Sequence, residues 1–227
     1  MPLTILVALK EEWQVAWQSS SFRKMTITGL LLATAIMAVF PVFFQTIEKR
    51  SGFVLHDPIL ARLPAHNVSL AIFVIIWTIC LLVMARAAKN PTVFLTFLWV
   101  WIPVTLMRLL AITLVPLDPP VGLVGLVDPV SNFFYGEKFV TKDLFFSGHT
   151  SMVFLLYLCL SGRKEKRLGL IATAAVAFLL LVQHVHYTLD VVGALVFTWI
   201  TYWGVRKTIL KGFYDPGQET PFRDQEA

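Results

Sequence analysis

The sequence has little charge, little cysteine and no repeated or low-complexity segment. Only 15% of its 227 residues are charged, against about 25% in soluble domains, and 57% are hydrophobic. This composition, with a mean hydropathy of +0.72, excludes most soluble globular classes and is typical of a polytopic membrane protein. The two cysteines, Cys80 and Cys159, lie inside apolar runs, so we interpret them as small core residues and not as a disulfide or metal pair.

Acidic residues are also scarce: 14 Asp and Glu stand against 19 Lys and Arg, for a formal net charge of +5. In a membrane protein such a surplus reflects topology and anionic lipid more often than nucleic acid. Basic residues are not interleaved with aromatic ones, so nucleic acid is not an expected partner. The N-terminus, MPLTILVALKEEW, does not resemble a signal peptide, because its charges follow the apolar residues and include two acids.

The apolar runs predict an all-α polytopic membrane protein with six transmembrane helices in a bundle. Within lipid the backbone must bond to itself, so helices are the expected form of such spans. Three runs are long, at about 25–46, 68–88 and 92–115, and three are shorter but bounded by charge, at about 145–161, 168–184 and 188–205.

The same pattern predicts three parts of the chain. Residues 1–24 are expected to form an interfacial segment, either an amphipathic helix or a partly ordered terminus. Residues 25–210 are expected to form one six-helix membrane domain, because no internal repeat divides them. Residues 211–227 are expected to form a polar cytoplasmic tail.

The distribution of basic residues predicts the orientation in the membrane. With six spans, thirteen of the 19 Lys and Arg residues lie on the side of both termini, five lie on the other side, and Arg108 lies within a span. The positive-inside rule therefore puts both termini in the cytoplasm and the loops at 47–67 and 116–144 outside. We expect a multi-pass protein of a bacterial inner membrane, with its active site facing outside.

Two histidine-bearing stretches fall on the predicted outer side, DLFFSGHT at 143–150 and HVHYTLD at 184–190. Ionisable groups at the mouth of an apolar segment are costly, so they indicate function. His186 and Asp190 are four residues apart, so on a helix they share a face. The carboxylate can then accept the imidazole N–H, fix its tautomer and stabilise the imidazolium ion.

The SGHT segment is predicted to open a helix. Ser147 is a good N-cap, and Gly148 permits close approach of the backbone. Free N–H groups at a helix start favour phosphate, and His149 can donate a proton to a departing oxygen. The two stretches thus offer a nucleophile or base with its orienting carboxylate, an acid and an anion cradle. Phosphoryl transfer through a phosphohistidine needs these parts.

These residues resemble the sphingomyelin synthase branch of the type 2 phosphatidate phosphatase (PAP2) superfamily. The resemblance is strongest over Asp143–Thr150, where GHT is preceded by Asp143-x-x-Phe-Ser, and over His184–Ala194, which contains HYTLDVVGA. A weaker similarity is RLLAITLVPLDPP at 108–120, which looks like the branch's arginine-containing helix and the turn that follows it. The resemblance covers the whole six-helix plan.

The resemblance implies roles for individual residues. His186 attacks phosphorus, Asp190 assists it, and His149 protonates the leaving group; these three are the expected catalytic residues. The expected substrate-binding residues are Arg108, Asp143, Ser147, Gly148, Thr150 and His184. Asp143 could equally be an acid that the helix dipole favours at the helix N-terminus, or a residue that orients His149. His184 could have a structural role, or it could contact the residues that touch the substrate.

No cofactor or metal is expected. Histidines and an aspartate are plausible zinc ligands by type, but no His-x3-His or His-Glu-x2-His pattern puts paired imidazoles on one helix face. The phosphatase motif Lys-x6-Arg-Pro is also absent, which fits the synthase-like branch. In this chain Asp143 follows Lys142 where the synthases usually show glycine, so the donor headgroup stays open.

The expected function is therefore a lipid phosphotransferase or phosphatase at the exoplasmic face. Its partners are a phospholipid donor and, as acceptor, a lipid alcohol such as diacylglycerol or ceramide, or water. The alternative is a non-enzymatic lipid-binding or transport protein that retains the fold, although neither broken helices nor repeated halves are evident. Nothing in the sequence indicates an oligomeric state.

Overall fold

The computed structural model describes residues 3–126, 140–211 and 213, with only the backbone described for residues 3–10. In this part of the chain the fold is all-helical and has no strand, which confirms the predicted all-α class. Most of the predicted tail at 211–227 lies outside the described residues. The helices are α1 (Leu3–Gln18), α2 (Ser20–Glu48), the short 3-10 helix η1 (Leu60–Arg62), α3 (Ser69–Lys89), α4 (Pro91–Leu114), α6 (Gly148–Cys159), α7 (Arg163–Val182) and α8 (Thr188–Thr208).

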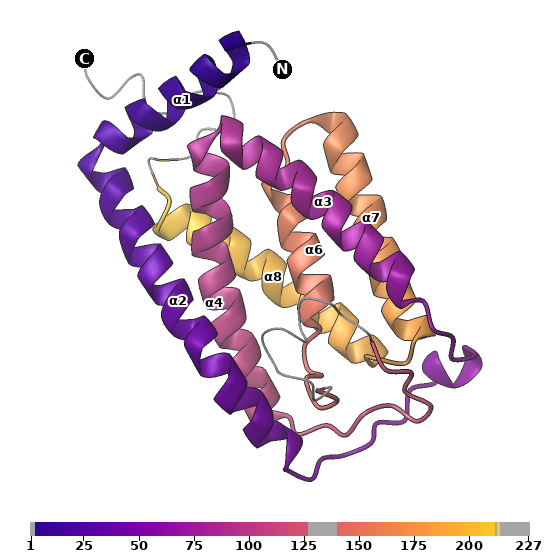
Figure 1. Cartoon of the computed structure of the whole chain (residues 1–227). Coiled ribbons are helices and arrows are strands. Elements are labelled where there is room, and N and C mark those ends of the chain that lie inside the picture. Colours follow the sequence, from indigo (N-terminus) through magenta and orange to yellow (C-terminus); the bar gives the residue numbers. More distant parts are fainter. Residues whose placement is uncertain (1–2, 127–139, 212, 214–227) are drawn as a thin grey trace.

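α6 lies at the centre of the bundle, where it contacts α3, α4, α7 and α8 (Figure 1). α2 runs beside α4 along one side, and α3 and α7 form the opposite side. α1 lies at one end of the bundle, and the segment between α2 and α3 lies at the other end, together with the starts of α6 and α8. The two histidine motifs therefore share one end of the described molecule, opposite α1. The direction of the bundle in a membrane stays a prediction.

Local capping explains where two of the central helices begin. Asn90 precedes α4, its side chain accepts a hydrogen bond from the N–H of Thr92 at 2.9 Å, and Pro91 occupies the first helical position. Ser147 precedes α6 and its Oγ accepts from the N–H of Thr150 at 3.3 Å, as predicted. Both caps are local features that can be read from the sequence.

Within the described residues, four helices are long and apolar enough to cross a membrane: α2, α3, α4 and α8. α6 is apolar but has 12 residues, and at 1.5 Å per residue it is about 18 Å long, shorter than a hydrocarbon core of about 30 Å. α7 has 20 residues, but all five residues of its start, RKEKR at 163–167, are charged. Six helices lie where six spans were predicted, while the number that cross the membrane stays a prediction.

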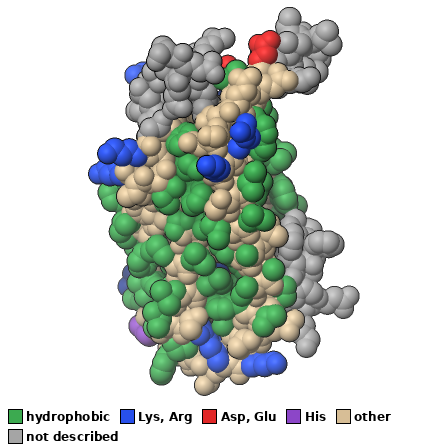
Figure 2. All heavy atoms as spheres, turned by 90° about the vertical axis from the view of Figure 1, so that its left-hand side faces the viewer, with side chains coloured by type: hydrophobic (Ala, Val, Ile, Leu, Met, Phe, Trp, Pro, Cys, Tyr) green, Lys and Arg blue, Asp and Glu red, His purple; other side chains and the backbone are tan. Residues whose placement is uncertain are grey.

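Large apolar side chains are exposed on α2, α3, α4, α7 and α8, and this surface is called the apolar belt below. Large apolar side chains are exposed along α2, among them Leu31, Val39 and Val42. On the face that α2 forms, apolar side chains cover the middle of the molecule, and Lys and Arg side chains gather toward its ends (Figure 2). Exposed apolar surface of this extent is typical of a lipid-facing surface. With four apolar helices of sufficient length, it indicates an integral membrane protein.

Close packing between α6 and α7 depends on Gly169. A Cβ atom at Gly169 would lie 3.1 Å from Cβ and 3.2 Å from Cα of Tyr157, whereas at Gly204 in α8 it would meet nothing within 4 Å. We expect Gly169→Leu to lower the free energy of unfolding by about 1–3 kcal/mol, because the helices must separate. The measurement is thermal unfolding in detergent, with Gly204→Leu as the control. Equal melting temperatures for the two variants would contradict this packing.

Candidate active site

A backbone hydrogen bond joins the starts of α6 and α8. The N–H of Ser147 donates to the C=O of Asp190 at 3.1 Å. Ser147 also caps α6, and its C=O accepts from Ser151 Oγ at 2.7 Å. Ser147 and Asp190 are both fully buried. The SGHT and HYTLD motifs, which are far apart in the sequence, therefore meet at this point.

Arg108, on α4, packs against the start of α6. Its Nε donates to the C=O of Phe146 at 3.0 Å, and its Nη2 forms an ion pair with the carboxylate of Asp143. Gly148 makes this approach possible, because a Cβ atom there would lie 2.7 Å from Arg108 Cζ and 2.8 Å from its Nη2. Arg108 is 9% exposed, and its guanidinium needs such partners, since an unpaired buried charge is costly. The group that Gly148 accommodates in this structure is Arg108, and its part in a phosphate cradle stays a prediction.

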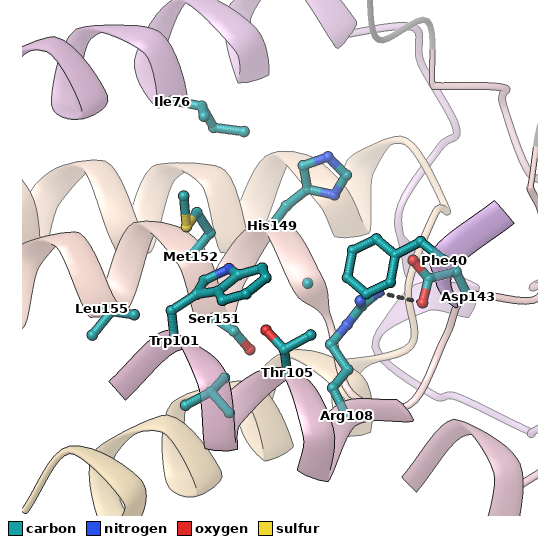
Figure 3. A pocket seen from close by; sticks show the side chains of 12 residues that line it. Phe40, Ile76, Trp101, Thr105, Arg108, Asp143, His149, Ser151, Met152 and Leu155 are labelled. Atoms are coloured by element: carbon teal, nitrogen blue, oxygen red, sulfur yellow. Dashed lines mark hydrogen bonds and ion pairs between the residues drawn. The ribbon is translucent and has the colours of Figure 1, made fainter. Parts of the chain in front are cut away.

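Arg108, Asp143, Gly148 and His149 line one end of a cavity of about 310 Å³. Figure 3 shows His149, Arg108 and Asp143 toward one end of this cavity, and Met152 and Leu155 toward the other. A charged end and an apolar end together fit an amphipathic anion. Below, this space is called the arginine cavity; its remaining walls are Phe40, Ile76, Trp101, Val104, Thr105, Ser151, Met152 and Leu155.

His186 and Asp190 are in contact, but not on one helix face as predicted. α8 begins at Thr188, so His186 lies in the turn before it. Asp190 Oδ2 accepts the N–H of Tyr187 at 2.9 Å and lies 3.3 Å from His186 Nδ1. The carboxylate thus reaches back from the first turn to the residues before the helix, as in a capping box. Among the described residues, Nε2 of His186 has no hydrogen-bond partner.

The structure separates the predicted site residues into groups. His149, Arg108, Asp143 and Gly148 share the arginine cavity. His186 is 2% exposed and is not among the residues that line this cavity; it is connected to it through Asp190 and the backbone of Ser147. Ser147 and Thr150 are also fully buried, and the hydrogen bond between them stabilises the start of α6. Thr150 Oγ1 has no hydrogen-bond partner in the described part of the chain.

His184 lies at a second cavity, which also contains His56, Asp57 and Tyr187. Its Nδ1 is 2.9 Å from the C=O of Val121, and its Nε2 is 2.9 Å from the C=O of Leu63. The ring therefore links the segment after α4 to the segment before α3. This geometry fits the structural role that the sequence left open for His184.

The zinc alternative required His149, His184, His186 and Asp190 to gather around one ion. His149 and His184 line different cavities. Across the residues that the structure describes, no three His, Cys, Asp or Glu side chains are grouped as metal ligands.

Glu48 is a residue that the sequence analysis missed. At the end of α2, its carboxylate accepts from Thr141 Oγ1 at 2.5 Å, from Thr141 N–H at 3.0 Å and from Lys142 N–H at 3.2 Å. Lys142 Nζ in turn pairs with Asp118 Oδ1 at 2.9 Å. These contacts hold the segment that leads into Asp143. No sequence signal relates Glu48 to Thr141, because 93 residues separate them.

Asp57 was also missed, and it fixes the start of α8. Its carboxylate accepts from the N–H of Thr188 at 2.6 Å, from Thr188 Oγ1 at 3.1 Å, and from the N–H groups of Ile59 and Leu60. Burial opposes ionisation of this carboxyl, but the hydrogen bonds outweigh burial and lower the pKa of Asp57. An ionised acid at a helix N-terminus is also favoured by the helix dipole.

We expect Asp57→Ala to lower the free energy of unfolding by about 1 kcal/mol at pH 7, because α8 loses its N-terminal partner. Since the pKa of Asp57 is lowered in the folded protein, its contribution is present above about pH 4 and is lost as the pH falls through the lowered pKa. Thermal unfolding of both proteins from pH 7 to pH 3 measures the difference. A difference that grows as the pH falls would contradict this role.

Comparison with known proteins adds one match. Residues 142–207 match the family model described as PAP2 superfamily C-terminal. The matched segment contains His149, His186 and Asp190, and it begins after Arg108. No curated protein and no solved structure matches the chain. Since the match extends over both histidine motifs, it supports membership in the PAP2 superfamily, whose members are phosphatases and phosphotransferases.

Proposed function

We propose that this protein is a lipid phosphotransferase or phosphatase of the sphingomyelin synthase-like branch that works through a phosphohistidine. It takes the phosphate or headgroup phosphate of a phospholipid and passes it to a lipid alcohol, such as diacylglycerol or ceramide, or to water. The observation that carries the proposal is the hydrogen bond from Ser147 to Asp190, which holds the two histidine motifs together beside the arginine cavity.

His186 is the proposed nucleophile. Asp190 Oδ2 lies 3.3 Å from its Nδ1, so the carboxylate favours the tautomer that carries the proton on Nδ1. That tautomer leaves the lone pair on Nε2, which has no hydrogen-bond partner among the described residues. In the first step Nε2 bonds to phosphorus, and the bond from phosphorus to the leaving oxygen breaks. Asp190 stabilises the imidazolium character that develops on the ring.

His149 is the proposed general acid and base. It lies in the first turn of α6 and lines the arginine cavity. In the first step it donates a proton to the leaving oxygen. In the second step it accepts the proton of the attacking hydroxyl or water while the bond between phosphorus and His186 Nε2 breaks. Both histidines return to their starting states, so the cycle is balanced.

Arg108 is the proposed phosphate contact. Its side chain is held by the C=O of Phe146 and packed on Gly148, so its orientation does not need to be established during the reaction. The N-terminus of α6 adds the partial positive charge of the helix dipole at the same place. Fixed positive groups of this kind stabilise the charge that develops on a transferring phosphoryl group.

The apolar end of the arginine cavity is the proposed site for the lipid chain. Trp101, Met152 and Leu155 continue the wall of the cavity from His149 away from the loops. A lipid can then present its phosphate to Arg108 while its apolar part stays among apolar side chains. A lipid alcohol and water can use the same two histidines, so the acceptor depends on access to this cavity. We place the reaction at the outer face, from the positive-inside prediction.

Replacing His186 with Ala removes the nucleophile, so we expect lipid turnover to fall by about a thousandfold or more. Purified protein is incubated with fluorescent phosphatidylcholine, phosphatidylethanolamine or phosphatidate, each with and without diacylglycerol or ceramide. Lipid mass spectrometry identifies the products. His56→Ala is the control, because His56 is exposed and lines the second cavity.

Two results of this experiment would contradict the proposal. One is turnover at the wild-type rate in His186→Ala. The other is movement of label between leaflets without chemical change in the wild type, which would support the lipid-transport alternative.

A further inference from the structure

The arginine cavity contains a carboxylate beside its guanidinium. Of the residues that line it, three can carry charge: Arg108, Asp143 and His149. Asp143 forms an ion pair with Arg108, so it offsets the permanent positive charge of the cavity. An anion that reaches Arg108 therefore also meets a carboxylate.

Asp143 is held in this position from outside the cavity. The two residues before it are bound to Glu48, and Lys142 Nζ also pairs with Asp118 Oδ1 at 2.9 Å. The Asp143 side chain keeps 24% of its surface exposed, so it stays accessible to a ligand in the cavity. The Arg108 guanidinium stays beside Asp143, because its Nε donates to the C=O of Phe146 and the group packs against Gly148.

We propose that Asp143 is a specificity-determining residue that makes this site favour singly charged phosphodiesters over doubly charged phosphomonoesters. The inference rests on the proposed function, since it describes the substrate of the same site. Repulsion from a fixed carboxylate is twice as large for a dianion as for a monoanion at the same distance. A phosphomonoester carries close to two charges above its second pKa of about 6, whereas a phosphodiester carries one.

A purely structural role for Asp143 leads to a different expectation. A buried guanidinium that loses its partner is destabilised, so neutralising Asp143 would then weaken the protein and both kinds of ligand alike. Asn is the informative substitution, because its amide oxygen can still accept from Arg108 Nη2 while the negative charge is removed. A change in the preference between two ligands separates the specificity role from the structural one.

The experiment measures binding of methyl phosphate and dimethyl phosphate to the full-length protein in detergent at pH 8, by calorimetry. For Asp143→Asn we expect about tenfold tighter binding of methyl phosphate and about threefold tighter binding of dimethyl phosphate. The control is Glu165→Gln, which removes one carboxylate charge in the first turn of α7, outside the cavity. It should leave the ratio of the two affinities unchanged.

The wild-type protein provides a second test that needs no variant. We expect it to bind dimethyl phosphate at least as tightly as methyl phosphate. Tighter binding of methyl phosphate by the wild type overturns the inference, as does an unchanged affinity ratio or weaker binding of both probes in Asp143→Asn. Neither probe has to be turned over. A shifted ratio of the two affinities therefore supports the inference even if His186→Ala retains lipid turnover. If the ratio stays unchanged, the inference fails even when lipid turnover is normal.

Discussion

The hydrogen bond between the backbones of Ser147 and Asp190 is the constraint on which the site depends. It joins two helix starts that the sequence separates, and both residues are fully buried. A buried backbone group left without a partner costs about 1–3 kcal/mol, so the two starts are held together by more than packing. Because the bond involves no side-chain oxygen of Asp190, the carboxylate is free to serve Tyr187 and His186. The backbone contact thus joins the two helix starts and leaves the Asp190 carboxylate available to His186.

Around this contact, charge is concentrated at one end of an otherwise apolar bundle. Arg108 is buried among polar partners that come from the segment before α6, and Glu48 binds that segment from the end of α2. The outer segments are therefore part of the site, although they contribute little to the helical core. The apolar belt and the charged end have separate roles. The belt faces lipid, and the contacts of Arg108, Glu48 and Asp57 position the proposed site.

The sequence predicted the helices well, because apolar runs and caps are local. Motif spacing and the cost of ionisable groups in lipid also indicated His149, His186 and Asp190, whose catalytic roles stay a prediction. It placed the last span at about 188–205, where α8 lies, but it wrongly expected His186 and Asp190 to share a helix face, because the two residues can meet either on a helix or across a helix start. The roles of Glu48 and Asp57 depend on contacts 93 and 131 residues apart, which no local pattern encodes.

The central claim is that His149 and His186 act on one phosphorus atom, although His186 does not line the arginine cavity. The most direct measurement is an experimental structure of the protein with vanadate, which adopts the geometry of a phosphoryl group in transfer. We predict vanadium bonded to His186 Nε2, with His149 hydrogen-bonded to the opposite oxygen and Arg108 contacting another. Vanadate bound to Arg108 and His149 with His186 remaining buried and uncoordinated would contradict the account.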